Sequence, residues 1–142
     1  MTSRLVSVAT PFVFPVRIYY EDTDMAGVVY YANYLKFYER GRTEMVRAMG
    51  LDQQLLIEQG LAFAVARFEA DYLKSARFND ALEVVTEITK VGRASIVFAQ
   101  HIRKAGEPMN ILNKAQVKVA CVTVADMKPA ALPEQLLKEL QA

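Results

Sequence analysis

The chain has few of the residue types that carry redox or metal chemistry. Its 142 residues include one cysteine, one histidine and no tryptophan. The single cysteine, Cys121, excludes an intrachain disulfide, and its place in the alternating run KVACVTV indicates a buried small hydrophobe. The single histidine, His101, stands in no cluster of cysteine, histidine or acidic residues, which predicts neither a metal site nor a Cys–His nucleophile. We expect no metal and no cofactor.

Neither sign of charge dominates, with 17 basic against 16 acidic residues. A nucleic-acid-binding module would normally carry a basic stripe, so we expect no nucleic-acid partner. No apolar run approaches the length of a bilayer span. Residues 1–18 contain Pro11 and Pro15 and are typical of a tail followed by a strand, not of a secretory signal. We expect one cytoplasmic domain over residues 1–142.

The order of predicted elements is strand, long helix, then a run of four strands with hairpin-like links. Strands are expected at 12–20, 63–73, 81–91, 94–103 and 113–126, and helices at 33–49, 52–59 and 132–140. The apolar positions Leu35, Tyr38, Met45 and Met49 mark the buried stripe of the long helix, with Asn33 as its N-cap and Gly50 as its stop. This pattern indicates an α+β fold with a mainly antiparallel sheet.

Pro15 predicts an edge position or a bulge for the first strand. An unprotected sheet edge is a liability unless it is paired. Hydrophobic residues make up 53% of the chain, which is high for its size and indicates apolar surface buried between subunits. We therefore expect a second copy of the chain to pair with one edge of the sheet.

An acidic segment separates the first strand from the long helix. Glu21, Asp22 and Asp24 can simply complement the positive end of the helix dipole. However, Gly27 permits close backbone approach, and a helix start offers free N–H groups that can hold a carbonyl oxygen as it gains charge. A carboxylate beside such donors can attack a carbonyl carbon or activate a water. That chemistry is acyl transfer to water.

The stretch YYEDTDMAGVVYYANYLKFYERGRTE, residues 19–44, resembles the start of hotdog-fold acyl-CoA thioesterases of the 4-hydroxybenzoyl-CoA thioesterase type. Within that group it is most similar to the thioesterases associated with the Tol–Pal system. The later stretches YLKSARFNDALEV, GRASIVF and KVACVTVAD…KPAALP resemble the family's strands in their usual order. The resemblance covers about residue 14 to about residue 137.

The resemblance implies a long central helix wrapped by a five- to six-stranded sheet, and a homodimer or homotetramer joined at the sheet edges. It implies hydrolysis of acyl-CoA, so coenzyme A is part of the substrate; acyl carrier protein is an alternative donor. It assigns catalysis to two residues, the carboxylate of Asp24 and the backbone N–H of Tyr31. Asp22 and Gly27 are expected to support the loop.

The resemblance also implies positions that contact the substrate. Basic residues of the family bind coenzyme A at the subunit surface, and the matching positions are Arg93 and Lys128. From their places in the sequence, and not from the resemblance, Phe63 at the start of the second strand and Val29 after the acidic segment are expected to contact the acyl group; a simple core position is the alternative for Phe63.

Two departures from the family pattern leave alternatives open. The Tol–Pal-associated relatives usually carry histidine where this chain has Tyr31, and Met25 adds bulk beside Asp24. A non-catalytic acyl-thioester-binding or assembly protein of the cell envelope is one alternative, and a hotdog dehydratase or hydratase is another. A helix carboxylate, Glu39 or Glu44, is a less favoured candidate for the acid.

Overall fold

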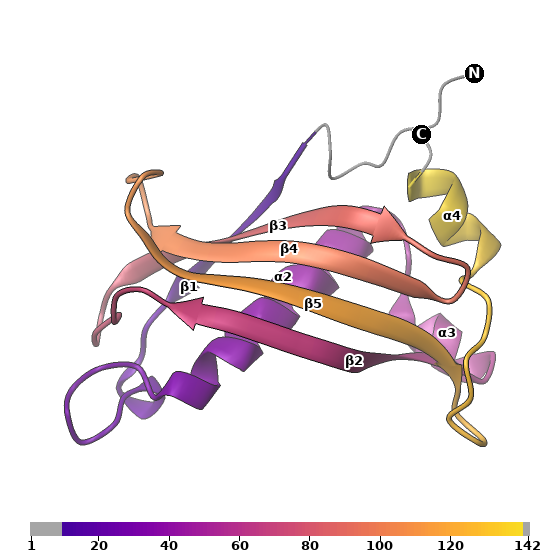
Figure 1. The fold of residues 1–142 in the computed structure, drawn as a ribbon, viewed down its shortest axis with the longest axis horizontal. Coiled ribbons are helices and arrows are strands. Elements are labelled where there is room, and N and C mark those ends of the chain that lie inside the picture. The colour runs from indigo at the N-terminus through magenta and orange to yellow at the C-terminus, as the bar shows by residue number, and fades with distance from the viewer. Residues whose placement is uncertain (1–9, 141–142) are drawn as a thin grey trace.

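The computed structural model describes residues 10–140, so the tail predicted at residues 1–9 lies outside the described part. Figure 1 shows the strands as arrows and the helices as coils. The strands are β1 (Phe12–Arg17), β2 (Leu61–Tyr72), β3 (Ala81–Val91), β4 (Ser95–Lys104) and β5 (Ile111–Thr123). The α-helices are α2 (Tyr34–Ala48), α3 (Gln53–Glu58) and α4 (Glu134–Leu140). The acidic loop, residues 21–30, begins within the 3₁₀ turn η1 (Tyr20–Asp22) and ends where the 3₁₀ turn η2 (Tyr31–Asn33) begins.

The five strands form one antiparallel sheet in the order β1-β3-β4-β5-β2, which confirms the predicted α+β class. The pairs β3–β4 and β4–β5 are hairpins, as predicted. The predicted hairpin link between β2 and β3 is wrong, because β2 pairs with β5 and residues 73–80 cross the end of the sheet to reach β3. This crossing carries Arg77 to a β-bridge with Val28 of the acidic loop.

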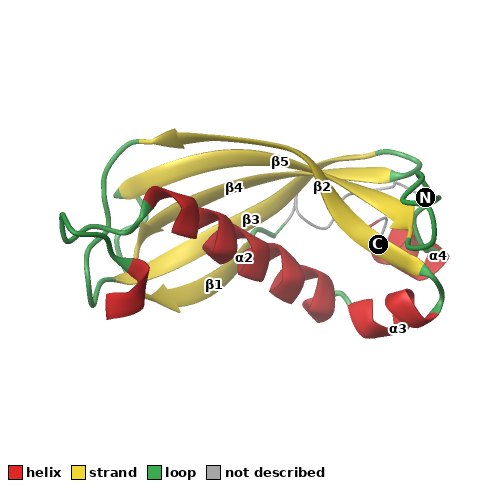
Figure 2. Ribbon diagram, turned by 90° about the horizontal axis from the view of Figure 1, so that it is seen from below, coloured by secondary structure: helices red, strands yellow, loops and turns green. Residues whose placement is uncertain are grey.

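Helix α2 lies along one face of the sheet (Figure 2). Its buried face is Tyr34, Phe37, Tyr38, Gly41, Met45 and Val46. Leu35 was predicted for this face but is 44% exposed, because the buried stripe starts one residue earlier, at Tyr34. Gly50 follows the helix with a φ of +89°, the left-handed conformation expected of a C-terminal glycine.

Gly41 lets α2 approach the sheet closely. A Cβ built at this position would lie 2.8 Å from Val84 Cγ1 and 3.1 Å from Thr86 Oγ1. Beside it, the buried Gln100 side chain joins helix to sheet: its Nε2 donates to the Tyr38 carbonyl oxygen at 3.0 Å and to Thr86 Oγ1 at 2.9 Å. The helix is therefore held in one position by both steric contact and hydrogen bonds.

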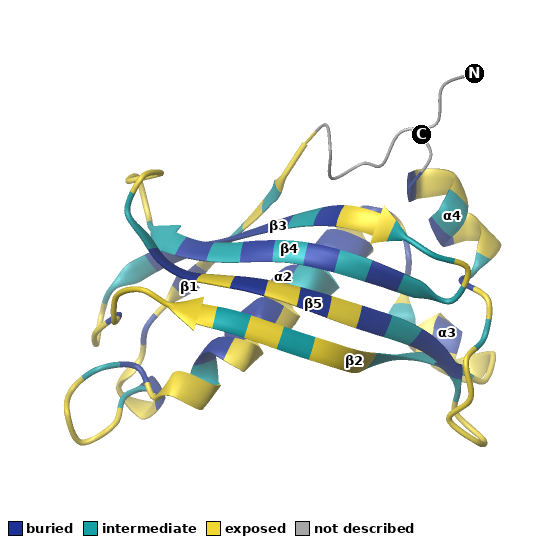
Figure 3. Cartoon of the chain, in the orientation of Figure 1, coloured by how far each residue is buried: buried dark blue, intermediate teal, exposed yellow. Residues whose placement is uncertain are grey.

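Burial alternates along β5, as Figure 3 shows by colour. Ala115, Val117 and Val119 face the helix side and are buried, whereas Gln116 and Lys118 between them are exposed. Cys121 continues the buried row, as predicted for a small hydrophobe. Within residues 10–140 we find no helix with the length and hydropathy that a membrane crossing requires.

The two outer strands of the sheet differ in how well their free edges are protected. Pro15 lies in β1 and removes one backbone donor from that edge, as predicted for an edge strand. The strand β2 contains no proline, and its Val65, on the helix side of the sheet, is 54% exposed. The unprotected edge of the sheet is therefore β2.

Replacing Gly41 by valine is expected to lower the free energy of unfolding by about 1–3 kcal/mol, because the added side chain overpacks the contact with Val84. Urea denaturation measures this change. The matched control is Ala48→Val, on the exposed side of the same helix, where only a helix-propensity loss of about 0.5 kcal/mol is expected. Equal stabilities for the two variants would contradict the close contact.

Candidate functional site

The acidic loop is built around the buried carboxylate of Asp22. Its Oδ2 accepts from the Tyr19 N–H at 2.8 Å, and its Oδ1 accepts from Asn33 Nδ2 at 2.8 Å. Its backbone carbonyl accepts from the Tyr30 N–H at 2.9 Å. Asp22 thus ties the end of the first strand to the start of the helix. Asn33 directly precedes α2, but its side chain makes no capping bond because it binds Asp22 instead.

Asp24 lies at the start of a tight turn that ends at Gly27. The Asp24 N–H donates to the Val28 carbonyl at 2.9 Å, and the Gly27 N–H donates to the Asp24 carbonyl at 3.0 Å. Gly27 has a φ of +83°, which favours glycine. One carboxylate oxygen of Asp24, Oδ1, accepts from the Ala26 N–H at 2.9 Å. The other oxygen has no hydrogen-bond partner among residues 10–140, which leaves it available to a ligand.

The helix start provides the complementary donor. Tyr31 is the first residue of η2, so its N–H has no acceptor within the helix. No other acceptor for this N–H is found in the described part of the chain. The peptide that carries it is fixed, because the Tyr30 carbonyl accepts from the Asn33 N–H at 2.8 Å.

A hollow of about 220 Å³ brings the loop and the helix start together. We call it the helix-start hollow, and it is lined by Asp24, Val28, Val29, Tyr31, Tyr34, Tyr72, Leu73, Lys74 and Ser75. Three residues singled out from the sequence, Asp24, Tyr31 and Val29, therefore lie on one cavity. Asp24 is solvent-exposed in the single chain but borders this hollow.

The sequence did not single out Tyr72, Lys74 and Ser75 as part of this hollow. These three residues come from the end of β2 and the crossing segment after it, which pass beside the helix start. Tyr72 donates its hydroxyl to the Tyr31 carbonyl at 2.9 Å. The Tyr34 hydroxyl accepts from the Ala76 N–H at 3.1 Å, and burial raises the pKa of Tyr34. The sequence pattern around Tyr72, Lys74 and Ser75 indicates only strand and loop, so no local signal distinguishes these three residues.

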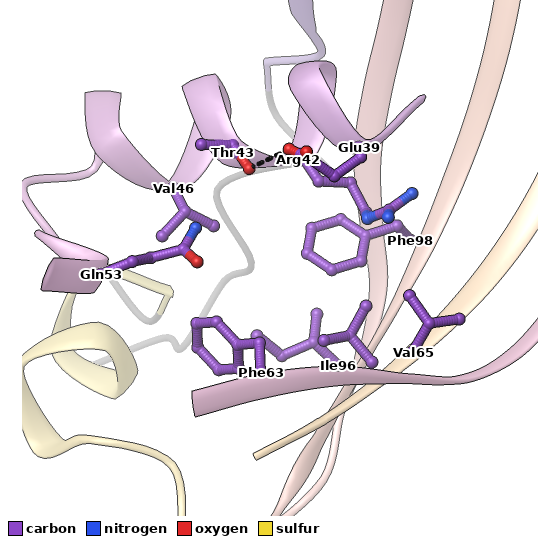
Figure 4. Close-up of a pocket in the computed structure, with 10 residues that line it drawn as sticks. Glu39, Arg42, Thr43, Val46, Gln53, Phe63, Val65, Ile96 and Phe98 are labelled. Atoms are coloured by element: carbon purple, nitrogen blue, oxygen red, sulfur yellow. Dashed lines mark hydrogen bonds between the residues drawn. The ribbon is translucent and has the colours of Figure 1, made fainter. Parts of the chain in front are cut away.

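A second space of about 380 Å³ lies between α2 and the sheet, and we call it the helix–sheet chamber (Figure 4). Its walls are mainly apolar: Phe63 and Val65 of β2, Ile96 and Phe98 of β4, Val119 of β5, and Val46 of α2. Glu39, Arg42, Thr43 and Gln53 complete the lining.

Two charged side chains of the chamber, Arg42 and Glu39, already have partners. Arg42 Nη1 donates to Gln100 Oε1 at 3.0 Å, and burial lowers the pKa of the guanidinium. The Glu39 carboxylate accepts from the Thr43 hydroxyl at 2.6 Å. Both interactions are within one chain and suit a structural role.

Phe63, Arg93 and Lys128 lie far from Asp24 of their own chain. Phe63 and Tyr72 stand near opposite ends of β2, about 30 Å apart at the usual rise per residue. Arg93 lies in the β3–β4 turn, and Lys128 follows β5, whose end is hydrogen-bonded to Gly60 before β2. Figure 1 shows the β3–β4 turn and the end of β5 on one side of the molecule, with the acidic loop on the other. One chain therefore does not bring Phe63, Arg93 and Lys128 together with the residues of the helix-start hollow.

His101 is not part of either space. Its neighbours Gln100 and Ile102 face the helix side, so its side chain lies on the opposite face of the sheet. Partial burial, together with Arg103 and Lys114, lowers its pKa. Residues 10–140 also contain no group of three histidine, cysteine or acidic side chains placed to hold a metal.

The chain is similar in sequence to known thioesterases. The family model described as the thioesterase superfamily matches residues 26–109, more than half of the chain. The chain is 47% identical over 132 residues to the acyl-CoA thioester hydrolase YbgC of Escherichia coli O6:H1, which covers 93% of this chain and 97% of that protein. It is 48% identical over 126 residues to the acyl-CoA thioesterase YbgC of Haemophilus influenzae, with 88% and 90% covered.

A solved structure has the same fold. The probable thioesterase from Bartonella henselae superposes with a TM-score of 0.80 at 34% identity, covering 87% of this chain and 100% of that chain. A long helix against one five-stranded antiparallel sheet is the arrangement of the hotdog fold, which confirms the predicted fold. The chain belongs to the thioesterase superfamily.

Replacing Asp22 by asparagine is expected to lower the free energy of unfolding by about 1–3 kcal/mol, because an amide NH₂ would then face the Tyr19 N–H or the Asn33 NH₂ and leave a donor unpaired. The exchanged pair Asp22→Asn with Asn33→Asp restores an acceptor for each donor and is expected to recover at least half of the loss. Urea denaturation of the three proteins measures both effects. A single variant as stable as the wild type would contradict the bridging role of Asp22.

Proposed function

We propose that this thioesterase hydrolyses acyl-CoA to a free acid and coenzyme A in the helix-start hollow. The observation that carries the proposal is that Asp24 and the free N–H end of the helix at Tyr31 border the same cavity. The names of the relatives, acyl-CoA thioester hydrolase and acyl-CoA thioesterase, support the same substrate class.

In the proposed reaction the thioester carbonyl oxygen accepts a hydrogen bond from the Tyr31 N–H. As a nucleophile adds to the carbonyl carbon, negative charge develops on this oxygen, and the fixed N–H stabilises it. The free oxygen of Asp24 either adds to the carbon itself or removes a proton from the water that adds. The C–S bond then breaks and coenzyme A leaves as the thiol after taking up a proton. Where Asp24 itself adds to the carbon, a water then hydrolyses the resulting mixed anhydride, which releases the free acid and restores the carboxylate.

The proposed reaction uses no metal or cofactor. A backbone donor polarises the carbonyl, and a carboxylate supplies the electron pair or accepts the proton. The thiolate of coenzyme A is a good leaving group and needs no Lewis acid. The proposed location is the cytoplasm, and association with Tol–Pal proteins or with acyl carrier protein stays a prediction from the family resemblance.

We further propose that the working unit contains a dimer joined at β2. This edge is unprotected and carries the exposed Val65, whereas the β1 edge contains Pro15. If two β2 strands pair antiparallel about their middle, the Tyr72 end of each strand meets the Phe63 end of the other. The helix-start hollow of one subunit then adjoins the helix–sheet chamber of its partner.

This pairing accounts for substrate-binding residues that one chain holds far from Asp24. Phe63 lines the apolar chamber of the partner and is suited to contact the acyl group. Arg93 and Lys128 are exposed and lie at the same end of the sheet as Phe63. Their cationic side chains are suited to bind the phosphates of coenzyme A. The site is therefore proposed to be complete only with both subunits.

The two alternatives differ in chemistry. A dehydratase or hydratase needs a histidine beside an acid, and His101 lies on the sheet face away from the hollow. A non-catalytic acyl-thioester-binding protein would use the same cavity without turnover. Turnover by the wild type that is lost in the Asp24 variant therefore separates the enzyme from this alternative.

Asp24→Asn is expected to lower the turnover of an acyl-CoA panel by about 100-fold or more, because the amide neither attacks carbon nor accepts a proton. Release of free thiol, followed with a thiol-reactive dye, measures the rate. The matched control is Glu21→Gln, an exposed acid of the same segment, which is expected to keep the wild-type rate. Equal rates for the wild type and Asp24→Asn would exclude Asp24. Binding of acyl-CoA without turnover by either protein would favour the non-catalytic alternative.

Hybrid dimers test whether two chains share each site. Asp24→Asn and Arg93→Glu are each expected to have low kcat/KM. After subunit exchange in a 1:1 mixture, about a quarter of all sites combine an intact Asp24 with an intact Arg93 of the partner, so about a quarter of wild-type activity is expected to return. If both residues act within one chain, mixing restores nothing. Each variant incubated alone is the control.

A further inference from the structure

The side chain of Tyr72 holds the peptide segment that carries the proposed oxyanion donor. Its hydroxyl donates to the Tyr31 carbonyl oxygen at 2.9 Å, and this bond joins the end of β2 to the start of the helix. Its ring contacts Tyr31 at 6.4 Å and Tyr34 at 5.6 Å between centroids, both edge-to-face. Tyr72 thus contacts the first turn of the helix by both ring and hydroxyl.

The direction of the Tyr31 N–H depends on the peptide between Tyr30 and Tyr31. In a planar trans peptide the N–H and the C=O point in opposite directions. The Tyr30 carbonyl points into the first helical turn, where it accepts from the Asn33 N–H. The Tyr31 N–H therefore points away from the helix, to the side where an anionic oxygen can approach it.

Hydrogen bonds fix the segment on both sides of this peptide. Upstream, the Tyr30 N–H donates to the Asp22 carbonyl at 2.9 Å. Downstream, the Tyr31 carbonyl accepts from Tyr72. The upstream bond comes from the acidic loop itself, whereas the downstream bond comes from a strand that is remote in sequence. Tyr72 therefore connects the donor to the rigid sheet.

We propose that Tyr72 is a positioning residue for thioester hydrolysis, and that its hydroxyl holds the Tyr31 N–H in the direction needed to stabilise the oxyanion. The inference rests on the proposed function of the helix-start hollow. Partial burial of the phenol and the neighbouring Tyr31 raise the pKa of Tyr72, so the hydroxyl keeps its donor proton at neutral pH. The residue lines the hollow but needs no contact with the reacting atoms.

The test is Tyr72→Phe, which keeps the ring contacts and removes only the donor. We expect kcat to fall about 5- to 20-fold, while KM stays within about twofold of the wild-type value. A misdirected donor lowers the stabilisation of the transition state more than that of the bound substrate. Amide exchange at Tyr31–Asn33 is expected to become faster, which reports the loosened helix start without any activity measurement. Tyr20→Phe, an exposed tyrosine that lies outside the hollow, is the control for both readouts.

The outcomes separate this inference from the proposed function. If Asp24→Asn loses its activity while Tyr72→Phe matches the wild type in kcat and exchange, the inference about Tyr72 is overturned and the proposed function stands. If Asp24→Asn keeps full activity, the proposed function fails, and the amide exchange of Tyr72→Phe decides whether the hydroxyl holds the helix start. A rise in KM with unchanged kcat would also overturn the positioning role, since it would indicate a binding contact.

Discussion

The arrangement of the site depends on the hydrogen bonds to the buried carboxylate of Asp22. A carboxylate removed from water is stable only when its oxygens accept hydrogen bonds. Here the donors come from Tyr19 before the loop and Asn33 after it. Satisfying that one buried group therefore closes the loop against the helix start. As a consequence, Asp24, two residues further on, lies at the edge of the hollow.

The second constraint is the order of strands in the sheet. Because β2 pairs with β5 and not with β3, the chain must cross the end of the sheet after Tyr72. That crossing supplies one wall of the hollow and fixes the helix start. The same order leaves β2 at the edge, where the backbone groups that face away from β5 have no partner strand among residues 10–140. One topological choice thus completes the hollow and exposes the surface that we propose joins two subunits.

The sequence predicted much of the fold because its local signals are strong. Alternating apolar residues gave the strands, Gly50 ended the long helix, and Pro15 indicated an edge. The same signals could not find Tyr72, because its neighbours indicate only a strand end and its partner Tyr31 is remote in sequence. Phe63 and Asp24 were both predicted for one site, but a sequence alone does not say which chain of a dimer supplies each residue. The structure separates them by most of the length of β2.

The exposure of Asp24 in a single chain has a physical consequence for the proposed catalysis. A carboxylate that is exposed to water is well solvated, so its free oxygen is a weak nucleophile and a weak base toward a bound thioester. The Ala26 N–H binds only one of its two oxygens and does not remove that water. Desolvation must then come from the groups that close over the hollow, which are the acyl-CoA itself and the β2 edge of the proposed partner. Assembly of the dimer and binding of substrate would thus activate the carboxylate together, because neither the loop nor the helix start excludes solvent on its own.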